Sequence, residues 1–577
     1  MVKTVRFLWF FGVVWLTGCA VSTGVVEDPS TPTMSADTPV ATLTELPEGE
    51  FSSQVMFQLL TAEVAGQRGE VGVAVSNYLA AAKESRDANV AERAARVAVL
   101  AQALEQALEA AELWVELAPD RAEAYQVLAP LLLTFGRAPE SVARYEQYIT
   151  LSADKVDQGF LQISGQLRLA KNATAALSVM DQLLVKHQDN PYAWLAHSQL
   201  GLRQGKLELA MASVDKSLAL KSHWAPAVVL RARIFSLQGN KDKALAYLEE
   251  ERDGELENDV SVSLSYARLL TETEQLPQAF AEFDRLAEQD PRNAEAQYAA
   301  GVLALQLNKL DKAEIRFKHV LRMRRRMLES SYYLGRVYEE KKEPEAALRY
   351  YFAVHHGEYY LGAQSRAANL LAEQGKLERA REHLQSLRVR NEQDQVRVYL
   401  VEGDLLRKAG QYMEALDFFA DKLEKMPDDT SLRYARALVA ERADKLDLAE
   451  EDLRIIIERE PSNAQALNAL GYTLADRTER FEEALGYITR ALEVEPADAA
   501  IIDSMGWVQY RLGNHAKAVE LLRQALSLFH DPEIAAHLGE VLWDMGNKQD
   551  ALNVLETALE KYPKHESLLD TMKRLGL

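Results

Sequence analysis

The sequence predicts an all-α fold: a solenoid of about fifteen helix pairs that fills most of the 577 residues. From about residue 51 onward, apolar residues recur at spacings of three and four and β-branched runs are few, which indicates helices. In addition, a small residue followed four positions later by an aromatic or aliphatic one returns every 33 to 35 residues. A single compact core stops growing near about 250 to 300 residues, whereas stacked repeats have no such limit.

The repeat can be followed through fifteen copies. Its small residues are Ala74, Ala107, Ser141, Ala176, Ala210, Ala244, Ala279, Ala313, Ala347, Ala380, Ala415, Ala449, Ala484, Ala518 and Ala551. Before Ala347, Leu334, Gly335 and Tyr338 share one predicted helix, and Tyr351 follows on the next. In spacing and residue type the chain resembles the tetratricopeptide-repeat (TPR) family, whose period is about 34 residues. The resemblance implies a right-handed superhelix with an inner wall formed by the first helix of each pair.

Glycine and proline mark the ends and contacts of these units. Gly471, Gly506 and Gly539 are expected to let a neighbouring helix approach closely, and proline ends a helix because it lacks an N–H group. The prolines that close units are Pro119, Pro291, Pro427, Pro461, Pro496 and Pro563. The units before about residue 155 match the repeat least well. We therefore expect divergent helical repeats over 51–155, a TPR superhelix over 156–563 and a polar-faced capping helix over 564–577.

The N-terminus has the pattern of a targeting signal. Lys3 and Arg6 precede an apolar run over 7–16, which is long enough for a signal peptide but covers only about half of a bilayer core. The run leads into Leu16, Thr17, Gly18 and Cys19, which resemble a bacterial lipobox. The resemblance implies that 1–18 is a lipoprotein signal peptide, that cleavage occurs before Cys19, and that covalent lipid on Cys19 is the chain's only attached group. The alternative is an ordinary signal peptide with an incidental cysteine.

The segment after the cysteine indicates where the anchor would lie. In lipoproteins of diderm bacteria an Asp directly after the lipidated cysteine is the usual signal for the inner membrane, and here Ala20 and Val21 follow. The resemblance therefore places the protein on the outer membrane, facing the periplasm. Residues 19–50 are rich in proline, serine, threonine and acids, which predicts a tether that spans roughly 30 Å as a coil.

Aromatic residues of the predicted first helices are candidates for partner binding. The helix phase puts Asn468, Tyr472 and Ala475 toward the inner wall. The strongest candidates cluster late in the chain: Tyr434, Tyr472, Trp507, Tyr510 and Trp543. Tyrosine and tryptophan combine rigid apolar area with one polar group, as interface hot spots do. The alternative is that these rings only fill space between helices.

Two charged stretches stand out in a chain of net charge −21. A basic patch consists of Lys318, Arg322, Arg324, Arg325 and Arg326, and it is a candidate surface for an acidic partner. An acidic run extends over 249–259. The alternative for both stretches is a solvated face without a partner.

Composition and motifs exclude several function classes. The negative charge argues against nucleic-acid binding, and the single cysteine allows neither an internal disulfide nor a cysteine-based metal site. No hydrolase, phosphate-binding or metalloprotease motif is present, so we expect no catalytic and no metal-binding residues. His355 and His356 are adjacent, and on a helix they would point in different directions.

These observations predict a non-catalytic scaffold that binds other proteins. Three segments, 466–477, 502–514 and 535–547, resemble the long TPR lipoproteins of proteobacteria. One such group is the adaptor of a carboxy-terminal processing protease and brings peptidoglycan hydrolases to it for degradation. The resemblance therefore implies a periplasmic protease and cell-wall hydrolases as partners. The alternatives are an assembly lipoprotein for polysaccharide export, pilus secretion or outer-membrane protein insertion, and a peptidoglycan-binding module.

Overall fold

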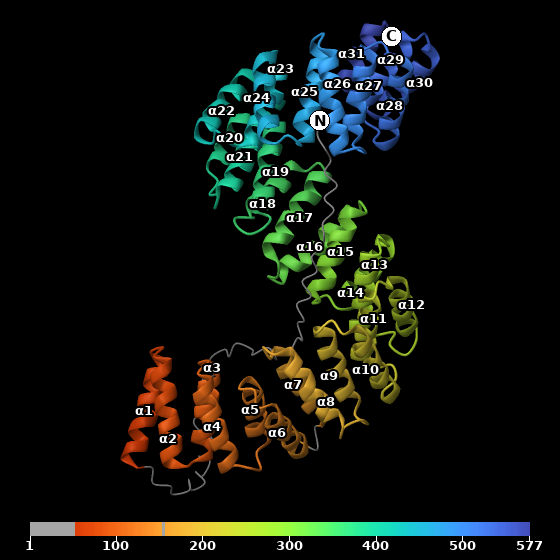
Figure 1. Ribbon diagram of the computed structural model, residues 1–577. Helices are drawn as coiled ribbons and strands as arrows, with labels where there is room; N and C mark the ends of the chain where they lie inside the picture. Colours follow the sequence, from red (N-terminus) through yellow and green to blue (C-terminus); the bar gives the residue numbers. More distant parts are fainter. Residues whose placement is uncertain (1–51, 153–155) are drawn as a thin grey trace, which may run out of the picture. The chain divides into compact units, whose positions relative to one another are not determined.

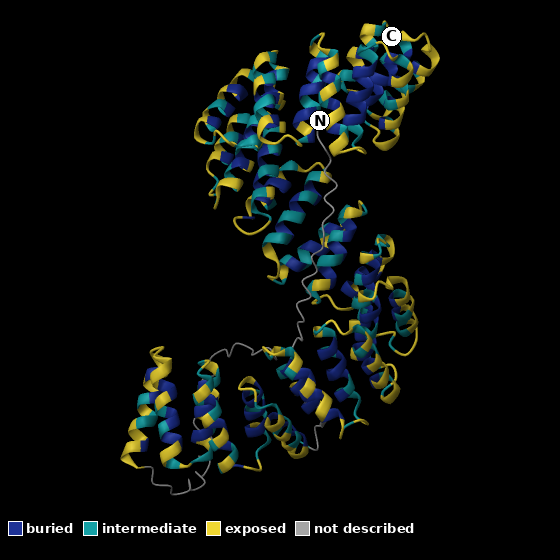
Figure 2. Cartoon of the chain, in the orientation of Figure 1, coloured by how far each residue is buried: buried dark blue, intermediate teal, exposed yellow. Residues whose placement is uncertain are grey.

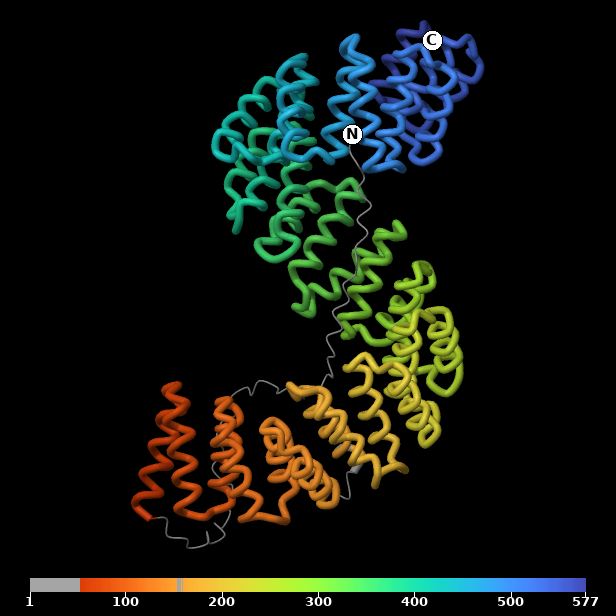
Figure 3. The backbone as a smooth tube through the Cα atoms, viewed as in Figure 1, coloured from red at the N-terminus to blue at the C-terminus, as the bar shows by residue number. Residues whose placement is uncertain are grey.

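The computed structural model describes residues 52–152 and 156–577. In these ranges every regular element is an α-helix (Figure 1). Contacts divide the described residues into two compact units, 52–152 and 156–577. Each unit is a row of antiparallel helix pairs (Figure 3). Among the described residues, no helix is both long enough and apolar enough to cross a bilayer.

The first unit contains three helix pairs. They are α1 (Ser53–Gln67) with α2 (Val71–Ser85), α3 (Ala88–Leu100) with α4 (Leu104–Leu117), and α5 (Ala122–Thr134) with α6 (Ala138–Leu151). Their core is rich in alanine and contains the fully buried ring of Trp114.

The second unit contains twelve further pairs and one closing helix. The first helices of the pairs are α7 (Val156–Leu169), α9 (Pro191–Arg203), α11 (Ala225–Leu237), α13 (Val260–Glu272), α15 (Ala294–Gln306), α17 (Met327–Glu340), α19 (Tyr360–Glu373), α21 (Glu392–Lys408), α23 (Thr430–Arg442), α25 (Ala464–Arg477), α27 (Ala499–Arg511) and α29 (Pro532–Asp544). The second helices are α8 (Ala173–Leu184), α10 (Leu207–Leu220), α12 (Lys241–Asp253), α14 (Leu276–Gln289), α16 (Leu310–Arg322), α18 (Pro344–Phe352), α20 (Leu377–Gln385), α22 (Tyr412–Lys425), α24 (Leu446–Arg459), α26 (Phe481–Val494), α28 (His515–Leu528) and α30 (Lys548–Lys561). Helix α31 (Glu566–Leu575) closes the row.

The repeat seen in the sequence sets the packing of every pair. All fifteen small residues, from Ala74 to Ala551, lie on the second helix of their pair, and each is at most 2% exposed. Buried residues accordingly form a continuous interior along each unit (Figure 2). The predicted all-α solenoid of about fifteen helix pairs is confirmed.

A second series of small residues lies opposite the first, on the first helix of each pair. It precedes the first series by twelve positions, as Gly335 precedes Ala347, and by thirteen at Gly471 and Ala484. Every member is alanine, serine or glycine, and every member is buried. A Cβ added at Gly471 would lie 2.5 Å from Ile488 Cγ1 and 3.0 Å from the carbonyl oxygen of Ala484. At this point the backbone of the first helix lies directly against the second helix of the pair. Only a small residue leaves room for so close an approach.

Two second helices are shorter than the period suggests. Helices α18 and α20 have nine residues each, and α21 has seventeen. The remaining residues form the links 353–359 and 386–391, so the period of the sequence stays constant while the helix lengths change.

First helices of successive pairs contact one another in the second unit, as α25 does with α27 and α27 with α29. Within residues 156–577, second helices of successive pairs make no comparable contact. First helices of successive pairs thus lie closer to one another than second helices do. The first helices therefore form the inner wall of the stack.

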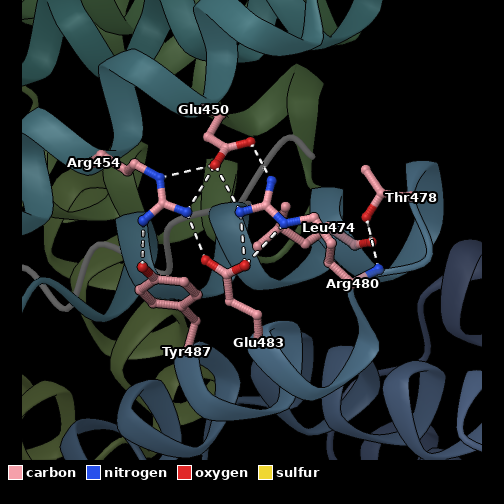
Figure 4. A network of polar contacts seen from close by, with 7 residues as sticks. All are labelled: Glu450, Arg454, Leu474, Thr478, Arg480, Glu483 and Tyr487. Carbon is pink, nitrogen blue, oxygen red and sulfur yellow. Dashed lines mark hydrogen bonds and ion pairs between the residues drawn. The ribbon is translucent and has the colours of Figure 1, made fainter.

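On the other side, charged side chains tie the second helices together (Figure 4). Glu450 and Arg454 lie on α24, Glu483 and Tyr487 lie on α26, and Arg480 directly precedes α26. Arg454 Nη2 lies 2.7 Å from Glu450 and 2.6 Å from Glu483, and Arg480 lies 2.8 Å and 2.6 Å from the same two carboxylates. These guanidinium groups lower the pKa of both carboxyls. The network thus joins the second helices of two successive repeats through side chains.

Candidate functional site

The inner wall of the second unit gathers acidic side chains near its C-terminal end. Four successive first helices each contribute one carboxylate: Glu441 on α23, Asp476 on α25, Asp503 on α27 and Glu533 on α29. Burial raises the pKa of the Tyr472 hydroxyl, and the negative charges of all four carboxylates raise it further. Carboxylates from four successive repeats therefore act on one hydroxyl. We call these four residues the acidic cradle.

His537 on α29 lies inside the cradle and is buried. Its Nδ1 is 3.0 Å from each carboxylate oxygen of Asp503, and its Nε2 is 3.3 Å from the hydroxyl of Tyr472 on α25. Its ring stacks on Trp507, with the centroids 4.4 Å apart. Burial lowers the pKa of His537, but Asp503, Glu533 and Asp476 raise it by more, to about 9. His537 is therefore a cation at neutral pH and offsets one of the four negative charges.

Trp507 supports the cradle from within the wall. Its side chain is buried, with 5% of the residue exposed, and its Nε1 donates a hydrogen bond of 3.2 Å to Asp476 Oδ1. The ring contacts Asp476 and His537. The sequence predicted that Trp507 would bind a partner, but its burial leaves little of the ring accessible.

The other predicted aromatics lie around this centre. Tyr510 and Tyr434 are half-buried and pack against the same apolar cluster as Tyr472, and the ring centroid of Tyr510 is 5.2 Å from that of Trp507. Trp543 belongs to the next apolar cluster and lies 4.8 Å from the Lys548 ammonium group. Ala475 is fully buried, so the accessible wall is narrower than the predicted helix phase implied.

The rim of the cradle carries the opposite charge. Burial raises the pKa of the Glu441 carboxyl, whereas Arg442 and Arg477 lower it and Asp476 and Glu533 raise it again. Arg477 Nη1 lies 3.4 Å from Glu441, and its Nη2 lies 2.6 Å from Asp444. An acidic centre with a basic rim suits a ligand that presents an ammonium or guanidinium group beside apolar atoms.

The Asp503–His537 pair is not accompanied by a suitable nucleophile. The hydroxyl facing His537 is the Tyr472 phenol, whose raised pKa keeps it protonated at neutral pH. Ser504 donates its hydroxyl proton to the carbonyl of Ala500, 3.0 Å away. Over residues 52–152 and 156–577, no group of three His, Cys, Asp or Glu side chains is placed to hold a metal ion. The arrangement can capture a charged group, but it lacks the parts for acyl transfer.

The predicted basic patch separates into two parts. Lys318 Nζ forms an ion pair of 2.6 Å with Glu314, one helical turn earlier, and so does not belong to an open patch. The Arg326 guanidinium lies over the Tyr298 ring, 4.6 Å from its centroid. Arg322, Arg324 and Arg325 are exposed and have no ion pair within the described ranges. Three free arginines therefore remain of the five predicted residues.

The acidic run over 249–259 is partly occupied by contacts of its own. Glu249 accepts a hydrogen bond of 3.1 Å from the Tyr266 hydroxyl, and Glu251 lies 2.8 Å from His223. Asp259 caps α13 through the backbone N–H groups of Ser261 and Val262. The lipobox residues Leu16, Thr17, Gly18 and Cys19 lie outside the described residues, as do the segments 1–18 and 19–50.

The sequence placed Tyr472 on the inner wall but did not group the four carboxylates around it. Glu441 follows the small residue Ala437 by four positions, Asp476 follows Gly471 by five, Asp503 precedes Gly506 by three and Glu533 precedes Gly539 by six. Because each carboxylate occupies a different position of the repeat, periodicity does not group them. They come together only because the inner wall curves.

Three comparisons place the chain among known proteins. Models of the tetratricopeptide repeat match residues 264–318, 298–356, 365–429, 434–502 and 509–575. The TPR repeat-containing protein PA4667 of Pseudomonas aeruginosa is 36% identical over 492 residues, which are 85% of this chain and 83% of that protein. Among solved structures, the TPR protein TTC0263 of Thermus thermophilus is 30% identical over 31% of this chain and 95% of its own, with a TM-score of 0.29. Yeast Tom70 is 14% identical over 73% of this chain and 95% of its own, with a TM-score of 0.34.

Proposed function

This chain belongs to the tetratricopeptide-repeat family, and we propose that it is a non-catalytic lipoprotein scaffold that holds protein partners against its inner wall. In this proposal Cys19 carries the lipid, the outer membrane holds the lipid, and the helical units face the periplasm. The lipobox resemblance of residues 16–19 and the acidic, proline-rich segment that follows support it.

The observation that carries the proposal is the acidic cradle with Tyr472 at its centre. Four repeats contribute charge to one place, and an aromatic surface lies beside it. A partner that inserts a lysine or arginine side chain would gain a charge-assisted contact inside a half-buried wall, where such contacts are stronger than in water. Neighbouring apolar residues of the partner would contact Tyr434 and Tyr510. The preferred partner segment is therefore basic and apolar.

More specifically, we propose that the scaffold is an adaptor of a carboxy-terminal processing protease. It would bring peptidoglycan hydrolases to this protease. The resemblance of the segments 466–477, 502–514 and 535–547 to the long TPR lipoproteins of proteobacteria supports this choice. Holding protease and substrate on one body raises their effective concentration without any new chemistry.

The test is affinity capture followed by a matched titration. The bait is the chain from Ala20 onward, exposed to periplasmic and membrane extract, with bound proteins identified by mass spectrometry. Recovery of a processing protease together with cell-wall hydrolases is the expected result. Recovery of export or secretion components would instead move the function to envelope assembly. An empty capture with binding to purified sacculi would favour the peptidoglycan-binding module.

The captured partner is then titrated against cradle variants. Glu441→Gln with Glu533→Gln removes two half-exposed cradle charges, and we expect binding to weaken about tenfold or more. Glu458→Gln with Glu479→Gln removes two exposed carboxylates that have no ion pair in the described parts of the chain, and serves as the control. Equal affinity of both double variants would contradict binding at the cradle.

A further inference from the structure

The link between α16 and α17 holds arginines that do not serve local folding. Several comparable links end in a residue that caps the next helix: Asn293, Asn463 and Asp498 each accept hydrogen bonds from backbone N–H groups of the first turn. The α16–α17 link ends in Arg326, whose side chain makes no capping hydrogen bond. Arg324 and Arg326 adopt the left-handed backbone conformation, with φ of 54° and 41°, which residues with a Cβ rarely adopt. Neither capping nor backbone preference thus explains these arginines.

A second pair of free arginines lies at the same end of the helices. Because helices alternate in direction, every link from a second helix to the next first helix emerges at one edge of the stack. In the link 386–391, Leu387 and Val389 pack against the apolar cluster, and Arg388 and Arg390 between and after them are exposed. Neither arginine forms an ion pair within residues 156–577. We call Arg322, Arg324, Arg325, Arg388 and Arg390 the arginine edge.

The intervening link carries aromatic surface along the same edge. Tyr359 ends the link 353–359, and its ring centroid lies 4.9 Å from that of Tyr332 and 5.7 Å from that of Tyr333. Tyr298, on which Arg326 lies, is 5.9 Å from Tyr333. These four tyrosines are half-buried. Arginine and tyrosine together are the residue types enriched at protein–protein hot spots.

We propose that the arginine edge is a second docking surface, which binds an acidic segment of a partner protein. Guanidinium groups present planar pairs of donors that match a carboxylate, and these five form no ion pair with acids of the described residues. The proposal rests on the scaffold function only in requiring a protein partner, and it does not depend on the cradle.

The charge of the whole chain favours a short acidic segment over an extended anionic surface. At net charge −21, the chain repels a membrane leaflet or a nucleic acid wherever that surface extends past the edge. A short segment carries little charge beyond the arginines that it contacts, because screening limits repulsion to about 8 to 10 Å at ordinary salt.

The test is direct binding of a defined probe. A short fluorescent peptide in which glutamate alternates with glycine is titrated against the soluble chain from Ala20 onward at about 50 mM and about 150 mM salt. The variant Arg322→Glu, Arg324→Glu, Arg325→Glu should weaken binding about tenfold or more, and Arg388→Glu with Arg390→Glu should weaken it by a smaller factor. The control is Arg68→Glu, Arg349→Glu, Arg379→Glu, which changes the net charge equally at exposed arginines that lack an ion pair in the described chain.

The outcomes separate this proposal from its competitors. Weakening by the edge variant alone, at an unchanged melting temperature, supports the arginine edge. Equal weakening by both triple variants, or no measurable binding of the peptide to the unaltered chain, overturns it. Binding to vesicles containing anionic lipid that depends on the edge, without peptide binding, would overturn it in favour of a membrane contact. If the glutamate variant unfolds, the glutamine variant at the same three positions is measured instead. Failure of the cradle variants in partner capture leaves the peptide result unaffected.

Discussion

His537 shows how neighbours decide the charge of a buried side chain. Burial alone favours the neutral imidazole, yet the pKa is raised to about 9 because Asp503 faces Nδ1 and the charges of Glu533 and Asp476 add to its effect. The groups that face it are Asp503 and Trp507 from α27, Tyr472 and Asp476 from α25, and Glu533 from its own helix. Since an unfolded histidine titrates near 6.5, the stabilisation is complete below about pH 6.5 and is lost as the pH rises through about 9.

We therefore expect the imidazole of His537 to titrate near pH 9 in the folded chain. NMR of selectively labelled histidine measures this pKa, and His537→Gln assigns the signal among the eleven histidines. In Asp503→Asn the pKa should fall by at least about one unit, because the charge that holds the proton is gone and burial remains. A signal that titrates near pH 6.5 in both proteins would contradict the contact. His537 would then be largely neutral at neutral pH, and the centre of the cradle would carry no positive charge.

At the scale of elements, the contact inside a helix pair depends on the size of one residue. Gly471 on α25 faces Ile488 and the Ala484 carbonyl on α26, so Gly471→Ala should force the two helices apart and destabilise the pair by about 1 to 3 kcal/mol. Gly486 lies on α26 itself, is exposed, and has no atom within 4 Å of an added Cβ. Gly486→Ala should therefore stabilise the same helix by about 0.5 to 1 kcal/mol.

The two glycine variants have opposite expected signs in one helix pair. Hydrogen exchange of the α25 and α26 amides measures each effect locally, which matters because long repeat arrays do not unfold in a single step. Faster exchange in Gly471→Ala and slower exchange in Gly486→Ala are expected. If both alanines slow exchange, the close approach of the two helices is not tight enough to matter.

Helix pairs could be predicted from the sequence because each pair repeats one physical requirement. Ala484, like the other fourteen small residues of its series, is buried on the second helix, as the period indicated. The short helices α18 and α20 could not be predicted. The links that follow them are longer, so the repeat length stays the same although fewer residues are helical. The matching series on the first helices could be predicted in part, from Gly471, Gly506 and Gly539.

The site was less predictable, because it depends on curvature and not on local pattern. Tyr472 was identified as a wall residue, but its contact with His537 spans two repeats. Trp507, which the pattern predicts to be an accessible ring, is buried and donates a hydrogen bond to Asp476. Small rotations between successive pairs accumulate into such contacts, and a period in the sequence does not specify them.

At the scale of the molecule, two surfaces of opposite charge lie on one unit. The acidic cradle uses α23 to α29, and the arginine edge uses the links around α17 and α21. Such a scaffold can hold a basic segment of one partner at the cradle and an acidic segment of another partner at the arginine edge. The two partners would not compete, because the cradle repels the acidic segment and the edge repels the basic one. Both partners would then be confined together wherever the chain itself is anchored.

The anchor is the last element of this arrangement, and Cys19 should decide it. Covalent lipid contributes about 0.8 kcal/mol per buried CH₂ group, and several acyl chains hold a protein on a bilayer almost permanently. The folded part offers no substitute, because a chain of net charge −21 is not attracted to anionic lipid. Cys19→Ser should therefore move the protein from the outer-membrane fraction to the soluble periplasmic fraction. Ala20→Asp is the matched variant: it keeps the lipid but should shift the protein to the inner membrane. Both are measured by fractionation on a density gradient, with far-UV circular dichroism to verify the fold. A Cys19→Ser protein that still sediments with outer membrane after a high-salt wash would contradict the lipid anchor.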